Sequence, residues 1–375
     1  MRRHGSKLIS LAAIAALLLV ALSVRQPVSG FAQDSRSASG GVDNGPVLVD
    51  VDDSFATFDT LSKDEVERRV ALEDSAATAK STSAASVSVS ATPVLAPAIP
   101  IPLPGGLDHV AAGTGTRNSG FGTIRLRGAP VGAAVVVAYL FWGTIYPTGG
   151  VPATATAVFN GVTVTGLLIG TSTQPCWNAA GTFAAYRAAV PVPAGINGDY
   201  RVSGLATSVA NGTSPWCPIV STLPLSEGAS LIVVYSHFSV PATAQVVISN
   251  GPLFFSGAAS ITHFLTLPVP AHSILKHTRL GADGQVGTAS CGLRSISSIT
   301  NERTFINLTQ IKGNGSPLNQ DSDWNGYDSD PLNKLWDTHT DDVIGSVPAG
   351  ATSYTVRYFA QGDCIVAVAH VLGAR

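Results

Sequence analysis

A run of acidic side chains near the C-terminus carries the pattern most typical of a metal site. It reads Asp321-Ser-Asp-Trp-Asn-Gly-Tyr-Asp-Ser-Asp330, and its first six residues match the Asp-x-Asp-x-Asn-Gly opening of an EF-hand-type calcium loop. Ca²⁺ prefers about six to eight oxygen ligands, and glycine at the sixth position permits the sharp turn. We therefore predict a calcium site formed by Asp321, Asp323, Asn325, Tyr327, Asp328 and Asp330.

The loop departs from a complete EF-hand at its end. Position twelve is Leu332 rather than a bidentate glutamate, and the sequence predicts no helix on either side. We expect an open calcium loop of the kind found in extracellular modules, with weak affinity of ~10⁻⁴–10⁻³ M. Further oxygen ligands could come from the later residues Asp337, Asp341 and Asp342.

The charge density around the loop favours a bound cation. Seven aspartates and one lysine lie between Asn314 and Asp342. Without a cation, such closely spaced carboxylates repel one another and raise one another's pKa. The alternative is a solvated acidic loop, in which the Asp and Asn side chains only stabilise turns.

A second set of residues in this region could bind a ligand. Trp324 lies among aspartates, so we expect its ring to be exposed, and tryptophan is enriched among residues that dominate binding. His339 has acidic neighbours in the segment Trp336–Asp342. We predict a surface that binds a protein or a glycan at the cell surface, formed by Trp324, Asp337, His339 and Asp341.

Catalytic patterns are absent from the sequence. Neither Gly-x-Ser-x-Gly nor His-Glu-x-x-His occurs, and only Glu227 and Glu302 are glutamates after Asp108. A glycosidase needs two carboxylates, a role open here to Asp337 and Asp341. We expect a non-catalytic protein. The alternatives are a carbohydrate-active protein, either lectin-like or a hydrolase, and a structural subunit of a surface layer or coat.

Histidine and cysteine spacing gives little support for a transition-metal site. His263, His272 and His277 match no ligand pattern, so we expect strand or turn histidines with satisfied hydrogen bonds. A zinc site on the cysteines is disfavoured because no Cys-x-x-Cys pair occurs.

The composition limits the classes of function. Of 375 residues only 12% are charged, and the net charge is −2, so we expect no basic face for nucleic acid. Glycine (38) and proline (23) are plentiful, whereas Glu, Lys and Met are scarce. This balance favours short strands and turns over helices.

Residues 1–32 have the layout of a secretory signal peptide. Basic residues precede the apolar run Leu8–Val24, and small residues, ending at Ala32, supply a cleavage site before Gln33. We expect a secreted protein that is extracellular or associated with the cell surface. An uncleaved anchor is the alternative, although the apolar run is short for spanning a bilayer. No second long apolar run follows, so we expect no stable membrane span after cleavage.

Cysteine usage agrees with export. Four cysteines allow three pairings, and the sequence alone does not choose among them. We favour pairs within each half of the β region, and each closed loop would contribute ~4 kcal/mol in the chain-entropy model. The favoured pairs are Cys176–Cys217 and Cys291–Cys364.

Residues 33–106 do not resemble a packed domain. Ser62–Lys80 predicts one helix, which begins with a capping box at Ser62 and Glu65 but has a thin apolar face. Ser81–Leu107 is uncharged, and its prolines favour an extended polyproline II spacer. We expect a flexible, low-complexity and partly helical linker; a propeptide or a stalk is the alternative.

Residues 107–375 predict one all-β domain. Strand patterns recur at short intervals between turn residues, with no convincing helix. About a dozen strands favour a single large antiparallel β-sandwich or jelly roll. The expected strands are 108–113, 122–127, 133–143, 154–159, 162–170, 183–190, 200–207, 230–236, 244–249, 260–267, 274–280, 304–311, 353–359 and 365–372.

Two local patterns within this region are the most specific. The run Ala133–Gly143 is apolar almost throughout, which predicts a central strand with both faces covered. Asn160-Gly161 separates two strand patterns, which predicts a type I′ hairpin because both residues tolerate positive φ. Trp142 in the first run is expected to be a core residue.

Four segments resemble an uncharacterised β domain that recurs in secreted and surface proteins of bacteria and archaea, sometimes beside adhesin-like repeats. They are Tyr139-Leu-Phe-Trp-Gly143, the run Glu227–Tyr235, Gly281-Ala-Asp-Gly-Gln285 and Trp336–Val343. The resemblance covers Leu107 to the end of the chain. It implies a β fold and an extracellular setting, but no activity and no functional residues.

Overall fold

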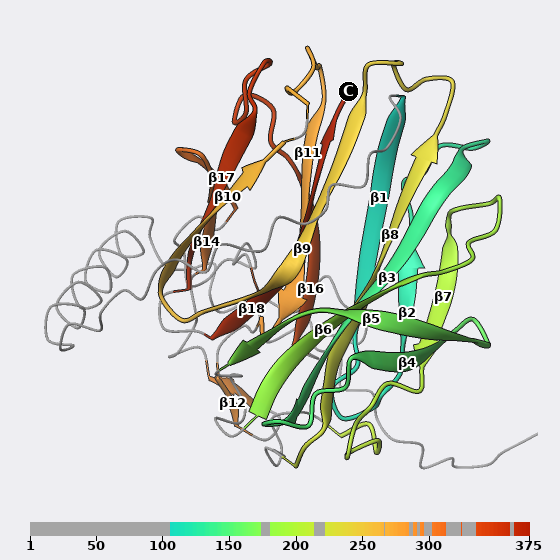
Figure 1. The fold of residues 1–375 in the computed structure, drawn as a ribbon, viewed down its shortest axis with the longest axis vertical. Helices are drawn as coiled ribbons and strands as arrows, with labels where there is room; N and C mark the ends of the chain where they lie inside the picture. Colours follow the sequence, from blue (N-terminus) through green and yellow to red (C-terminus); the bar gives the residue numbers. More distant parts are fainter. Residues whose placement is uncertain are drawn as a thin grey trace, which may run out of the picture. The chain divides into compact units, whose positions relative to one another are not determined.

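The computed structural model describes residues 106–173, 181–213, 222–265, 267–284, 288–290, 293–295, 302–312, 324, 335–360 and 364–375. These residues form antiparallel β-sheets and contain no helix (Figure 1). The all-β prediction is therefore confirmed for them. The predicted signal peptide, the helix at Ser62–Lys80 and the proline-rich spacer before residue 106 lie outside the described residues. Nor does this part of the chain hold any helix long and apolar enough to cross a bilayer.

The first half of the domain forms an eight-stranded sheet. Its strand order is β1-β8-β3-β6-β5-β4-β7-β2, with all neighbours antiparallel. The strands are β1 (Leu107–Gly115), β2 (Gly122–Leu126), β3 (Ala134–Pro147), β4 (Thr154–Phe159), β5 (Val162–Thr173), β6 (Gly181–Ala189), β7 (Gly198–Ser203) and β8 (Leu225–Ser236).

The second half forms two four-stranded sheets and a small hairpin, β12 (Thr288–Ser290) with β13 (Leu293–Ser295). The middle sheet has the order β16-β11-β18-β9, and the outer sheet has the order β10-β17-β14-β15. Their strands are β9 (Gln245–Phe255), β10 (Ala258–Phe264), β11 (Leu275–Ala282), β14 (Arg303–Ile306), β15 (Thr309–Lys312), β16 (Trp336–Asp342), β17 (Ser353–Phe359) and β18 (Ile365–Ala374).

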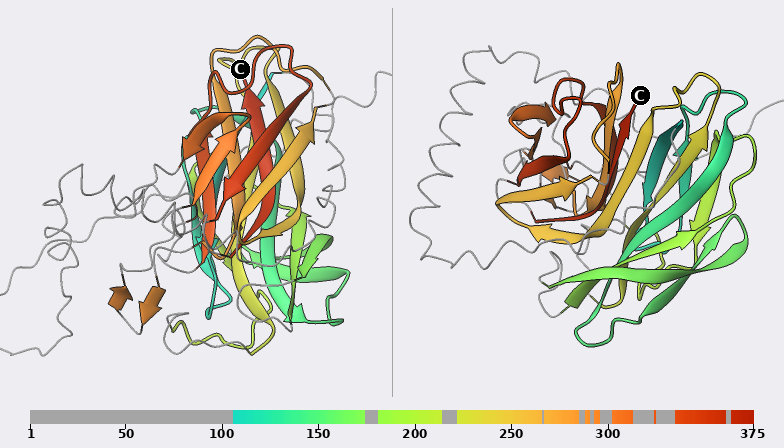
Figure 2. Two further views of the ribbon diagram at one scale, coloured as in Figure 1. Left: turned by 90° about the vertical axis from the view of Figure 1, so that its left-hand side faces the viewer. Right: turned by 45° about the horizontal axis from the view of Figure 1, so that its top comes forward.

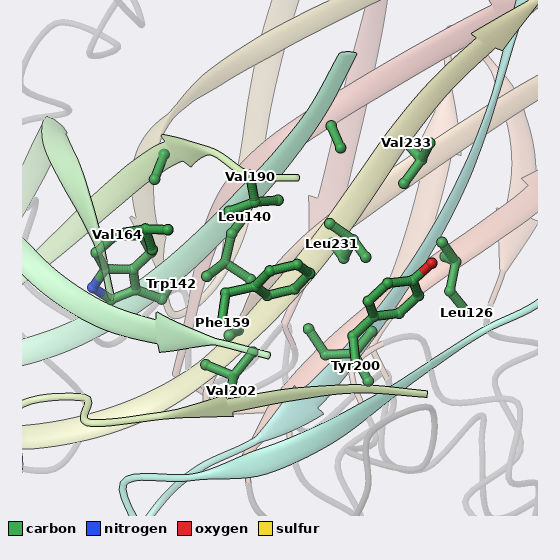
Figure 3. Packing of buried hydrophobic residues seen from close by; sticks show 14 of the residues in the cluster. Leu126, Leu140, Trp142, Phe159, Val164, Val190, Tyr200, Val202, Leu231 and Val233 are labelled. Carbon is green, nitrogen blue, oxygen red and sulfur yellow. The ribbon is translucent and has the colours of Figure 1, made fainter. Parts of the chain in front are cut away.

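Three apolar cores hold these sheets together. The first lies against one face of the eight-stranded sheet (Figure 3). Every strand of that sheet contributes to it. The second packs the opposite face of the same sheet against the middle sheet, and the third packs the middle sheet against the outer sheet (Figure 2). Stacked antiparallel sheets of this kind are consistent with the predicted β-sandwich.

The central strands are buried on both faces because they lie between two cores. Every residue of β18 is buried, and β8 is buried except at its last residue. The predicted central strand is confirmed as β3, which pairs with β8 and β6 and buries Leu140, Phe141 and Trp142. Such strands read as continuous apolar runs instead of alternating patterns.

The predicted hairpin at Asn160-Gly161 is also confirmed. Phe159 pairs with Val162, and the two turn residues have φ angles of 46° and 82°. Positive φ at both positions is what a type I′ turn requires.

One strand prediction was wrong in detail. The segment 304–311 is not one strand, because a turn with positive φ at Asn307 divides it into β14 and β15. The segment Trp336–Asp342, which was not among the expected strands, is β16, the edge strand of the middle sheet.

Candidate functional site

The edge strand β16 sorts its side chains onto two faces of the middle sheet. Trp336 donates a hydrogen bond to Ser230 of β8 at 2.8 Å, and the Thr338 hydroxyl lies 2.6 Å from the same oxygen. These residues therefore face the eight-stranded sheet. Because side chains alternate along a strand, Asp337, His339 and Asp341 share the other face, toward the outer sheet. Three of the predicted ligand-binding residues are thus brought together.

Strand β11 adds Arg279 and His277 to this face. Gly281, Arg279 and His277 pair with Asp337, His339 and Asp341 in register. The Arg279 guanidinium donates to the Asp341 carboxylate at 2.5 Å. We call the side chains of this face that lie between the middle and outer sheets the polar layer: His277, Arg279, Asp283, Asp337, His339, Asp341 and His370.

The ion pair of Arg279 and Asp341 stands where the polar layer meets the sheet edge. The Arg279 side chain is fully buried, whereas that of Asp341 is 19% exposed. Lys312 at the end of β15 brings its ammonium to 3.9 Å from the same carboxylate, so Asp341 links the two sheets. Removing one partner of a buried ion pair costs ~3–5 kcal/mol, because the remaining charge is buried without compensation.

Two further carboxylates lie deeper in the layer. Asp337 is fully buried, and its Oδ1 lies 3.3 Å from Nε2 of His339. Asp283 is also buried, has a φ of 73°, and donates its backbone N–H to the Leu335 carbonyl at 2.7 Å. Buried carboxylates are rare unless they are paired or bind a metal. Sequence reasoning missed Asp283, although the Gly281-Ala-Asp-Gly segment was singled out by resemblance.

The expected exposure of Trp324 was wrong. Its side chain is 0% exposed and lies in the third core, where its ring makes edge-on contacts with Phe255 and Tyr358. Its aspartate neighbours suggested an exposed side chain, but the indole is large enough to favour the core when a site is open to it. Trp324 therefore anchors the acidic loop to the domain.

Two glycines make room for this anchor. A Cβ at Gly281 would lie 2.7 Å from the Trp324 ring and 2.4 Å from the Val366 carbonyl oxygen. A Cβ at Gly284 would lie 1.7 Å from Oδ2 of Asp337 and 2.8 Å from the carbonyl oxygen of Trp324. The backbone of the loop and the Asp337 carboxylate therefore meet at Gly284. This is the point where the predicted calcium loop and the polar layer come together.

A histidine cluster forms the other end of the polar layer. The rings of His263 and His370 are 4.7 Å apart, and those of His277 and His370 are 5.5 Å apart. Nε2 of His370 lies 2.5 Å from the Tyr358 hydroxyl, and Tyr354 packs on His263. These histidines come from β10, β11 and β18, so no local pattern in the sequence indicates that they meet.

Burial keeps the clustered histidines neutral. It lowers the pKa of His263 to about 4. Burial also holds the pKa values of His277 and His370 well below the usual value, helped by Arg279 and the neighbouring imidazoles. Burial raises the pKa of the Tyr354 hydroxyl, so this cluster is uncharged at neutral pH. The cluster is a neutral polar lining within the core.

The prediction of satisfied hydrogen bonds holds for only one of the three histidines it covered. His272 has Nδ1 at 2.9 Å from the Pro270 carbonyl oxygen. Neither ring nitrogen of His277 has a partner among the described residues, and Nε2 of His263 lacks one too. Both side chains lie between sheets, where few backbone groups remain unpaired.

Both glutamates of the β region are buried. Glu227 forms an ion pair with Arg117 beneath the turn that follows β1, and both side chains are at most 1% exposed. Burial raises the pKa of Glu227, and the Arg117 guanidinium opposes this shift. Glu302 is 1% exposed at the start of β14. This placement makes Glu227 part of the structural support of the β1–β2 turn.

Several predicted site residues lie outside the described residues. They are Asp321, Asp323, Asn325, Tyr327, Asp328 and Asp330, and the cysteines Cys176, Cys217 and Cys291. Cys364, just before β18, is disulfide-bonded, and its partner lies outside the described residues, so the pairing stays a prediction. Within the described residues, no group of three or more His, Cys, Asp or Glu side chains has the geometry to hold a metal ion.

The two ends of the polar layer carry different kinds of donor atom. Carboxylate oxygens lie at one end, around Gly284, and neutral imidazoles lie at the other. Oxygen ligands suit calcium, whereas imidazoles suit transition metals. Comparison with known proteins adds no assignment: no protein-family model matches the chain, and a search of curated proteins finds no significant match.

Proposed function

We propose that this chain is a secreted, non-catalytic binding or adhesion module whose Asp321–Asp330 loop is ordered by calcium. Its partner would be a protein or a glycan at the cell surface. A single large β-sandwich that carries its binding residues at one sheet edge is the scaffold that we propose for this function. The signal-peptide pattern of residues 1–32 and the cysteine usage support the extracellular setting.

The observation that carries the proposal is the junction at Gly284. Trp324 occupies a variable position within the Asp-x-Asp-x-Asn-Gly pattern and is fully buried, which gives the predicted loop one fixed residue. Asp337 lies beside that point and is itself buried. A buried carboxylate beside the loop could add an oxygen ligand to a cation bound there, because buried carboxylates are normally paired or bound to a metal.

The donor set fits calcium. Asp321, Asp323 and Asn325 supply oxygen atoms at alternate positions of the loop, as a calcium loop requires. Asp328, Asp330 or Asp337 could then supply the remaining oxygens. The bound ion would neutralise the loop carboxylates and hold the loop against the edge of the middle sheet. An ordered loop presents its polar groups to a partner at a lower entropic cost than a mobile one.

Thermal unfolding of the full chain tests the calcium site. With ~5 mM Ca²⁺ and a dissociation constant of ~10⁻⁴–10⁻³ M, we expect a stabilisation of ~1–2 kcal/mol over the chelated protein, absent with Mg²⁺. The double variant Asp321→Ala/Asp323→Ala should lose this shift. The control Asp199→Ala, which removes an exposed carboxylate on β7, should keep it. Equal shifts in both variants would place the site elsewhere.

Binding is tested separately with the same proteins. Glycan arrays and adhesion to cell surfaces, each with Ca²⁺ and with chelator, should show calcium-dependent binding by the wild-type chain and none by the double variant. Turnover of pooled polysaccharides would instead contradict the non-catalytic assignment.

A further inference from the structure

One end of the domain consists of loops that carry exposed apolar side chains and no charge. Strand register places these loops together. Leu107 and Ala134 both pair with Ser236, and Ala374 pairs with Gln245 and with Leu275. We call this the loop end. It comprises residues 128–133, 237–244, 265, 267–274, 307–308 and 343–352, and it lies at the end that carries the C-terminus (Figure 1, Figure 2).

The apolar side chains project from separate loops. Val131 is 95% exposed, Phe238 is 94% exposed and Leu308 is 85% exposed. Leu267 and Ile344 are exposed in two further loops, and Phe264 is exposed at the end of β10. Five of the ten exposed large hydrophobic residues of the described chain therefore belong to the loop end, and Phe264 borders it.

The loop end also lacks charged residues. None of its loops contains Asp, Glu, Lys or Arg. Charges lie only at the borders of these loops: Asp108 lies 2.6 Å from the Lys276 ammonium and 3.1 Å from Nε of Arg375, Arg127 pairs with Asp199, and the exposed Asp342 accepts from the backbone N–H of Ile344. Exposed apolar side chains that gather at one end, instead of being scattered singly, mark an interaction surface. The pattern indicates a surface that leaves water.

Backbone hydrogen bonds within the loop end are made internally. Val269 donates to the Ala351 carbonyl and Gly350 to the Val269 carbonyl, both at 2.8 Å, which ties two of the loops together. Asn307 donates its side-chain amide to the Ser346 carbonyl at 2.6 Å. Such internal bonds favour transfer to an apolar environment, because an unpaired backbone group there costs several kcal/mol.

We propose that the loop end inserts into the apolar boundary of a lipid membrane. A protein partner would need a contiguous apolar core with a polar rim that makes hydrogen bonds. At the loop end, single apolar side chains project from separate loops, and polar groups of these loops form hydrogen bonds with one another. A bilayer interface accepts separate apolar tips, as it does the apolar face of an amphipathic helix.

The direction of the chain agrees with this orientation. Gly106 enters the domain at the loop end, where its N–H donates to the Ala244 carbonyl at 3.0 Å. The preceding residues 81–105 carry no charge. The chain therefore enters the domain, at Gly106, on the side that faces the bilayer.

Hydrogen exchange of the full chain, with and without phosphatidylcholine vesicles, tests the proposal. Peptides from 237–244 and 343–352 should exchange at least fivefold more slowly with vesicles. The apolar run Leu8–Val24 could also bind vesicles, so protection of the loops decides the outcome and attachment alone does not. Loops that exchange equally with and without vesicles, while the chain floats with them, would overturn the proposal.

Two matched variants complete the test. Phe238→Ser/Leu308→Ser/Ile344→Ser should remove the protection and weaken flotation at least tenfold if the loops bind directly. Val162→Ser/Leu167→Ser, on the exposed β4–β5 hairpin, should keep both properties. High salt should change neither result, because the loops carry no charge. Protection that rises with protein concentration without vesicles would point to self-association and contradict lipid binding.

Discussion

Replacing His277 by leucine should make the stability of this protein less sensitive to acid. Neither ring nitrogen of His277 has a partner among the described residues, and the side chain is fully buried. Removing such a polar group in favour of an apolar one of similar size is nearly neutral or stabilising. At pH 7.5 the variant should therefore be at least as stable as the wild type.

The pH effect follows from the direction of the pKa shift. Burial, with Arg279, His263 and His109 nearby, holds the pKa of His277 well below its usual 6.5. The folded protein keeps this histidine neutral, whereas the unfolded chain protonates it. Stability is thus complete above pH 6.5 and falls as the pH drops, by about 1 kcal/mol between pH 6.5 and 5.5 for one histidine.

Four histidines act in the same direction. Burial lowers the pKa of His109 to about 3 and that of His263 to about 4, and it holds that of His370 well below 6.5. Together with His277 they should remove about 4 kcal/mol of stability between pH 6.5 and 5.5, a large part of the usual ~5–15 kcal/mol of a domain.

Urea denaturation at pH 7.5, 6.5 and 5.5 measures the effect. His277→Leu should lose ~1 kcal/mol less than the wild type over the lower interval. Val356→Ala, which trims the third core, should be less stable at every pH but lose the same amount with acid. A wild-type pH dependence in His277→Leu would refute the assignment of a neutral, buried histidine in the folded state.

Three further predictions concern the polar layer and its anchor, and denaturation with urea measures each of them. Asp341→Ala should destabilise by ~3–5 kcal/mol because it removes the carboxylate that pairs with the buried Arg279 guanidinium, whereas Asp199→Ala, which breaks an exposed ion pair, should cost at most ~1 kcal/mol; equal losses would argue against a buried pair. Gly281→Ala should cost ~1–3 kcal/mol because its Cβ would press on the Trp324 ring, and a neutral result would contradict that packing. Trp324→Ala should lower the free energy of unfolding by ~3–5 kcal/mol, and a decrease below ~0.5 kcal/mol would contradict its burial in the core.

The strands that sequence reasoning found are those with an apolar run or a defined turn. β18 and the second half of β3 are apolar because both of their faces are covered, and Asn160-Gly161 marks its hairpin by backbone preference alone. These signals are local, so they do not depend on what the strands pack against. The all-β class followed from them.

β16 escaped recognition as a strand because both of its faces are polar. Thr338 and Thr340 face other hydroxyl groups, and Asp337, His339 and Asp341 face the polar layer. A strand without apolar alternation looks like a loop in a sequence. Its chemistry could be predicted from its acidic residues, but its role as the edge of a sheet could not.

The composition of the site depended on contacts between distant segments. His263, His277 and His370 meet only because the middle and outer sheets stack. Trp324 is buried although its neighbours are acidic, since the space beside Gly281 and Gly284 is created by a different segment. The acidic neighbours of Trp324 in the sequence therefore gave no indication that its side chain lies in the core.

Energy transfer from tryptophan to terbium tests the central claim most directly. Tb³⁺ takes the same oxygen ligands as Ca²⁺ and emits when a nearby indole is excited. If the calcium loop surrounds Trp324, the full chain should show this emission, Ca²⁺ should suppress it, and Trp324→Phe should abolish it while keeping the calcium-dependent rise in unfolding temperature. Unchanged emission in Trp324→Phe, or no emission from the wild-type chain, would contradict a calcium-ordered loop anchored at this residue.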